Sequence, residues 1–147
     1  MNIKMHTHPE ALEKYSFIWT EARLVIAAVA LFLGGIPPLS LLPLPSGIMS
    51  MLLTLSWDIS GVAAAYLLYR WYTGGQMVFG GKDKWDTAAF FVSVASGINL
   101  GLVGFLSTNI GMSIASSYPV FIVTGIVYLA AAYHLYKRYK ANSERIF

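Results

Sequence analysis

Four long apolar runs, separated by polar or proline-rich segments, form the main pattern of this sequence. A helix of roughly 20 apolar residues crosses a bilayer core about 30 Å thick. The runs therefore predict four transmembrane helices, at about residues 17–36, 48–72, 86–106 and 118–136. We expect an all-α fold, a polytopic membrane four-helix bundle that forms one transmembrane domain over residues 1–147, with polar tails at residues 1–16 and 137–147.

Proline and glycine mark the segments between these helices. Pro37 and Pro38 end the first helix, because proline lacks a backbone donor and disfavours helix at the residue before it. The stretch PPLSLLPLPSG that follows is typical of a rigid connector. The loop TGGQMVFGGKDKW predicts turns, and it lacks the Gly-Lys-Ser/Thr ending of a phosphate-binding loop.

The composition and the placement of charge both indicate an integral membrane protein. Only 12% of the residues are charged, whereas soluble domains are about 25% charged. Every Lys and Arg falls in the tails, in the loop between the second and third runs, or at a helix end beside them. The positive-inside rule then predicts a multi-pass protein, most simply of a prokaryotic cell membrane, with both termini in the cytoplasm. The basic residues are Lys4, Lys14, Arg23, Arg70, Lys82, Lys84, Lys137, Arg138, Lys140 and Arg145.

These basic residues lie beside apolar segments, where they attract anionic lipid of the inner leaflet. The expected partners are therefore the lipid bilayer, other membrane subunits or further copies of the chain, and not a nucleic acid.

The residue inventory argues against several kinds of active site. The chain has no cysteine, which excludes disulfides, thiolate catalysis and Cys-ligated metals. His134 has no second histidine in an apolar run, so a bis-histidine haem within the chain is excluded as well. No Ser-His-Asp arrangement, His-Glu-x-x-His motif or pair of catalytic carboxylates is visible. We expect no metal site, no separate soluble catalytic domain and no catalysis by the chain on its own; catalytic residues stay unknown.

Small residues recur every four positions along the third run, which places them on one helix face. Such a face lets another helix approach closely, and in lipid this packing drives helix association. The stripe predicts either packing within the bundle or a contact with another copy or subunit. Its members are Ala89, Ser93, Gly97 and Gly101.

Asp58 is the most informative polar residue, because it falls near the middle of the second run. A charge at that depth costs about 2.5–3.5 kcal/mol on insertion scales, and such acids usually face a bundle interior or a cavity. Asp58 is either a proton, cation or ligand site or a hydrogen-bonded residue that fixes helix packing. Asn99, in the third run, could join it in an intramembrane polar site or serve only as an inter-helix contact.

Three further charged residues are placed near the inner interface. Glu21 and Arg23 fall in the first turns of the first predicted helix, and Arg70 falls at the end of the second. Glu21 and Arg23 are two residues apart and do not share a helix face. Each could pair with another helix, and Arg23 could instead extend to the inner headgroups.

The first half of the chain resembles the DoxX/DoxD-like family of small four-helix membrane proteins. Arg23 and Gly34 match its early Arg and the Gly eleven residues later, and Asp58, Gly61 and Arg70 match an acid, a Gly and a basic residue in its second helix. The chain departs from that pattern in having Asp for the usual Glu, and Pro37-Pro38 in place of a Lys. The resemblance implies a small subunit associated with membrane oxidoreductases, including enzymes that reduce quinone.

The sequence leaves three functions open. The leading hypothesis is a small integral membrane subunit of a larger complex, associated with an oxidoreductase and interacting with quinone, which is the only cofactor suggested. The second is a small oligomeric ion- or proton-coupled transporter or channel that uses Asp58. The third is a structural membrane or envelope protein.

Overall fold

The computed structural model describes residues 9–114 and 116–147, and within them it is helical and contains no strand. The long helices are α1 (Pro9–Phe32), α2 (Ser46–Thr73), α3 (Lys84–Leu106) and α5 (Tyr118–Ala141). Two short helices, η2 (Pro38–Leu41) and α4 (Ile110–Ile114), lie in the connections. The four long helices are long and apolar enough to cross a membrane, as in an integral membrane protein, so the predicted all-α fold is confirmed.

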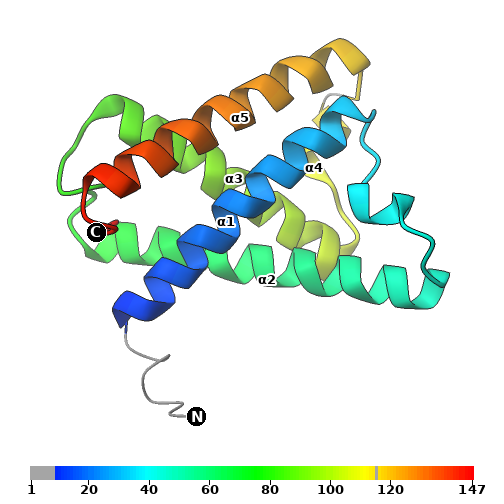
Figure 1. The fold of residues 1–147 in the computed structure, drawn as a ribbon, viewed down its shortest axis with the longest axis horizontal. Coiled ribbons are helices and arrows are strands. Elements are labelled where there is room, and N and C mark those ends of the chain that lie inside the picture. The colour runs from blue at the N-terminus through cyan, green and yellow to red at the C-terminus, as the bar shows by residue number, and fades with distance from the viewer. Residues whose placement is uncertain (1–8, 115) are drawn as a thin grey trace.

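The bundle has two chemically different ends (Figure 1). We call the end where α2 and α5 finish and α3 begins the charged end, because it carries Arg70, Asp86 and Arg138. We call the other end, where η2 and α4 lie, the capped end. Within the bundle, α1 packs against both α2 and α5, and α2 and α3 share the largest interface.

The first long helix starts earlier than its apolar run, at Pro9 and not near residue 17. Proline fits the first turn of a helix, and the polar turns after it are held by an ion pair between Glu13 and Arg70 of α2. Residues 1–8 of the predicted tail lie outside the described residues. The helix ends before Gly34 and Gly35, whose φ angles of 74° and 89° favour glycine. The predicted end near residue 36 is therefore too late.

Close glycine contacts join α2 and α3. A Cβ added to Gly101 would lie 2.6 Å from the Gly61 Cα, and one added to Gly97 would lie 2.6 Å from the Ala64 Cβ. Both distances are far inside ordinary van der Waals contact of about 3.5–4.0 Å. The structure thus places Gly97 and Gly101 of the small-residue stripe against α2 of the same chain, whereas Ser93 donates a hydrogen bond to Glu21 of α1. All four of its members, Ala89, Ser93, Gly97 and Gly101, are buried.

Helix α3 begins at Lys84 because Asp83 caps it. The Asp83 carboxylate accepts hydrogen bonds from the backbone N–H groups of Trp85, at 2.9 Å, and Asp86, at 3.1 Å. These bonds satisfy donors that a helix start otherwise leaves unpaired. Hydrogen bonds from the N–H groups of Asp86 and Trp85 also lower the pKa of the Asp83 carboxyl.

The last segment of the chain packs against the bundle and is not a free tail. Helix α5 continues to Ala141, past the predicted end at residue 136. Ile146 is then buried, and its carbonyl oxygen accepts a hydrogen bond from the Phe79 N–H at 2.6 Å. Phe79 and Val78 are buried too, so the glycine-rich loop turns inward at the charged end.

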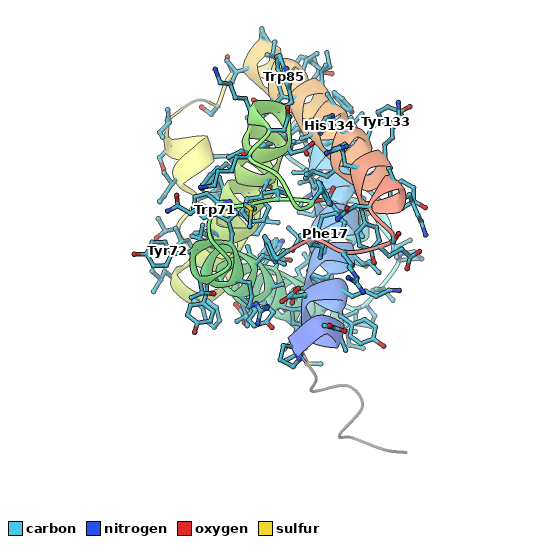
Figure 2. All side chains as sticks on the ribbon, turned by 90° about the vertical axis from the view of Figure 1, so that its left-hand side faces the viewer. Phe17, Trp71, Tyr72, Trp85, Tyr133 and His134 are labelled. Carbon is cyan, nitrogen blue, oxygen red and sulfur yellow. The ribbon has the colours of Figure 1, made fainter. Side chains whose placement is uncertain are left out.

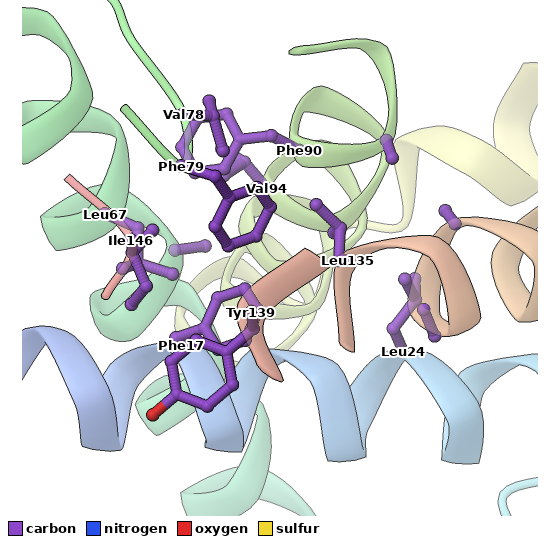
Figure 3. Packing of buried hydrophobic residues seen from close by; sticks show 14 residues of the cluster. Phe17, Leu24, Leu67, Val78, Phe79, Phe90, Val94, Leu135, Tyr139 and Ile146 are labelled. Atoms are coloured by element: carbon purple, nitrogen blue, oxygen red, sulfur yellow. The ribbon is translucent and has the colours of Figure 1, made fainter. Parts of the chain in front are cut away.

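The hydrophobic core lies toward the charged end (Figure 3). Phe17 packs against Tyr139, with ring centroids 4.8 Å apart, and edge-on against Phe79 at 6.2 Å. Figure 2 faces this end and shows Tyr72, Trp85 and other large side chains at its rim, whereas Phe17 lies among the helices. The core therefore joins α1, α5 and the inward-turned loop.

Candidate functional site

A cavity of about 400 Å³ lies among the four long helices, toward the capped end. Its volume is within the range of about 300–1,000 Å³ usual for small-molecule sites. Residues of η2 and α4 also line it, so the two short helices close the cavity at that end. Most of the lining is apolar, with a small set of polar side chains, namely Arg23, Ser96, Asn99, Asn109, Thr124 and Tyr128.

Arg23 is the one charged side chain among the residues that line this cavity. Because α1 begins at Pro9, Arg23 lies near the middle of the helix and not in its first turns. Its Nε–H is buried without a hydrogen-bond partner, and no carboxylate of residues 9–114 or 116–147 forms an ion pair with it. An unpaired guanidinium in a largely apolar cavity favours a ligand that supplies acceptor oxygens.

Asn99 connects the cavity wall to its cap. Its Nδ2 donates to the Asn109 Oδ1 at 3.1 Å, and its Oδ1 accepts from the Gly111 N–H at 3.2 Å. The Asn109 Oδ1 also accepts from the Met112 N–H at 3.0 Å. Asn99 therefore holds α4 in place over the cavity, in addition to lining it.

Asp58 lies apart from this cavity. Asp58 faces Gly104 of α3, where an added Cβ would collide with the Asp58 Oδ1. The same oxygen is buried without a hydrogen-bond partner in the described part of the chain. Gly104 is close to the end of α3 at Leu106, so Asp58 is level with the end of that helix. No hydrogen bond between described residues joins Asp58 to Asn99, so the structure does not bring the two predicted polar residues into one site.

The other predicted charged residues also have specific positions. Glu21 lies near the middle of α1 and is 9% exposed, and its Oε1 accepts from the Ser93 Oγ at 2.8 Å. Its Oε2 is buried without a partner in residues 9–114 and 116–147. Arg70 forms an ion pair with Glu13 at the charged end. Glu21 and Arg23 are thus both mid-helix groups, because the helix extends further toward the N-terminus than the apolar run.

Sequence reasoning missed a buried ion pair at the charged end. Asp86 is 1% exposed and accepts two hydrogen bonds from Arg138, from Nε at 3.0 Å and from Nη2 at 2.8 Å. His134 Nε2 lies 2.7 Å from the same carboxylate. The spacing of His134 and Arg138, four residues apart on one helix face, was the available signal. In the described residues no group of three or more potential metal ligands is brought together.

Comparisons with protein-family models, curated proteins and solved structures find no match to this chain. The resemblance to DoxX/DoxD-like proteins therefore stays a prediction.

Proposed function

We propose that this protein is a small integral membrane subunit that binds a lipid-soluble quinone in the cavity beside Arg23. The unpaired Arg23 guanidinium is the observation on which the proposal depends. A quinone has a planar apolar ring with carbonyl oxygens that accept hydrogen bonds. Such a ligand matches a largely apolar cavity with few donors. The Tyr128 hydroxyl and the Thr124 hydroxyl supply further donors to the same space.

The cavity also contains aromatic surface for a ring-shaped ligand. Trp57 and Phe121 line it together with Tyr128. Aromatic pairs gain about 0.5–1.5 kcal/mol beyond their buried area when their rings are offset-stacked or edge-on. In this proposal, Arg23 and the hydroxyls orient the quinone oxygens, and the aromatic side chains hold the ring.

Membership of a larger complex is a separate part of the proposal, and the first turns of α2 offer a surface for it. These turns contain a continuous set of exposed apolar side chains, which lipid or another membrane subunit would cover. Its members are Ile48, Met51, Leu52 and Leu55. Purification from the native membrane after mild solubilisation tests this part, because a redox subunit should be retained; an isolated chain without a partner would refute it.

A titration of tryptophan fluorescence tests the quinone site. Trp57 lines the cavity, so a short-chain benzoquinone should quench the protein's emission in a saturable way. Arg23→Gln should weaken binding by about ten- to a hundredfold, because hydrogen bonds to charged groups contribute about 1.5–3 kcal/mol. Arg145→Gln is the matched control, since Arg145 is exposed in the C-terminal segment. Equal affinity in both variants, or quenching that does not saturate, would refute the proposal.

A proton- or ion-coupled transporter is the second candidate, and the buried, unpaired Oδ1 of Asp58 favours it. The test is flux into proteoliposomes with Asp58→Asn. Flux that is unchanged in this variant would show that Asp58 is not the coupling group.

A further inference from the structure

A second recess lies between α1 and α5 and shares no lining residue with the Arg23 cavity. This α1/α5 groove has a volume of about 560 Å³ and an almost entirely apolar lining. Residues that line it include Glu21 and four aromatic residues, Phe17, Tyr133, Tyr136 and Tyr139. Tyr133 and Tyr136 are 69% and 56% exposed, so the groove opens at the surface of the bundle, where Figure 2 shows Tyr133 at the rim.

Glu21 is the one carboxyl group among the residues that line the groove. The side chain is more than nine-tenths buried, and its Oε2 has no partner among the described residues. No Lys or Arg lines the groove to neutralise it. Acids within apolar helices are costly and usually face a cavity or a partner, so an unused carboxylate oxygen at this position indicates a binding group.

Aromatic rings line the groove together with Glu21. Phe17 and three tyrosines, Tyr133, Tyr136 and Tyr139, line the same groove. Aromatic faces attract cations, and cages of such rings bind quaternary ammonium groups. The Tyr136 ring already attracts one cation, because the Lys140 Nζ lies 5.8 Å from its centroid. A nearby cation favours the charged form of a carboxyl group, so Glu21 and the aromatic faces together are complementary to a cation.

We propose that the α1/α5 groove binds a hydrophobic organic cation, with Glu21 as its counter-ion and the tyrosine rings against its apolar groups. A hydrophobic cation fits both the apolar lining and the carboxyl group of the groove. Its charge is covered by apolar substituents, so its transfer from water into the groove costs little. A lipid acyl chain would fill the volume but would leave the Glu21 oxygen unused. An anion of the same size would meet an acidic, electron-rich surface.

Binding of tetraphenylphosphonium to the purified protein in a mild detergent tests this proposal by equilibrium dialysis. Wild type should show one saturable site, and Glu21→Gln should weaken it about tenfold or more. Asp58→Asn is the matched control, because it removes an acid that does not line the groove, and its binding should not change. Tetraphenylborate, an anion of similar size and shape that is dialysed separately, should show no saturable binding.

A double variant, Tyr133→Leu with Tyr136→Leu, keeps the proposal testable if Glu21→Gln does not fold. Both tyrosines are exposed, so their replacement should leave the fold intact and weaken phosphonium binding severalfold. Arg23→Gln should leave phosphonium binding unchanged, which separates this site from the quinone cavity. Equal binding by Glu21→Gln and wild type, or saturable binding of tetraphenylborate measured on its own, would show that the groove takes up any hydrophobic molecule and would overturn the proposal.

Discussion

The contact between Gly61 and Gly101 allows a quantitative prediction for the α2/α3 interface. Gly101→Ala places a Cβ 2.6 Å from the Gly61 Cα, which is a backbone atom and cannot rotate away. The two helices must then separate by about 1 Å to reach ordinary contact at about 3.5–4.0 Å. Overpacking of this kind costs about 1–3 kcal/mol, whereas alanine is favoured over glycine in a helix by about 1 kcal/mol. We expect a net loss of up to about 2 kcal/mol in the free energy of unfolding.

Gly47→Ala is the matched control, because Gly47 lies in the first turn of α2 and an added Cβ there meets no atom within 4 Å. It should keep the helix gain without the packing loss, and so be neutral or slightly stabilising. Unfolding in mixed micelles with increasing denaturing detergent, followed by circular dichroism, measures both variants. If Gly101→Ala were as stable as Gly47→Ala, the close packing of α2 on α3 would be refuted.

Three further predictions concern the charged groups and the orientation of the chain. Hydrogen bonds from Lys14 and Lys140 lower the pKa of Glu144 from 4.5 to about 2. The stability that Glu144 contributes is therefore present above pH 4.5 and is lost as the pH falls toward 2. Glu144→Gln should flatten this part of a stability–pH curve; an unchanged curve would contradict it. Asp86→Ala should lower the free energy of unfolding by about 1–3 kcal/mol, measured by thermal or chemical unfolding. The cost is smaller than for a fully buried ion pair, because Arg138 is 43% exposed and stays hydrated. The chain has no native cysteine, so single cysteine variants can test the predicted cytoplasmic termini. In intact cells a membrane-impermeant maleimide should label Thr108→Cys and should not label Ser143→Cys. The reverse pattern would refute cytoplasmic termini.

The four long helices could be predicted because each one depends on a local property, a run of apolar residues long enough to cross a bilayer. Their ends depend on contacts with distant residues. The polar turns that begin α1 are helical because Glu13 pairs with Arg70 of another helix, and no periodicity reveals that pairing. Ile146 is buried through a bond with Phe79, so a segment that resembles a tail belongs to the core.

The candidate sites were predictable only in part. Hydropathy identified Glu21, Arg23 and Asp58 as polar residues in or beside apolar runs, but it could not show that Arg23 and Glu21 line separate recesses and that Asp58 lines neither. The Arg23 cavity depends on α4, which Asn99 holds in place, and α4 is too short to be recognised by helical periodicity. The α1/α5 groove combines residues that are more than 100 positions apart in the sequence, so it exists only once the bundle has assembled.

The ion pair between Asp86 and Arg138 has a consequence for how the protein is made in the cell. Asp86 belongs to the first turn of α3, whereas Arg138 belongs to the last turn of α5. During synthesis the carboxylate is therefore present before its guanidinium partner has left the ribosome. The third helix can enter the bilayer early, but its charged end cannot be buried until the last helix arrives. Synthesis of α5 thus completes the assembly of the bundle at that end.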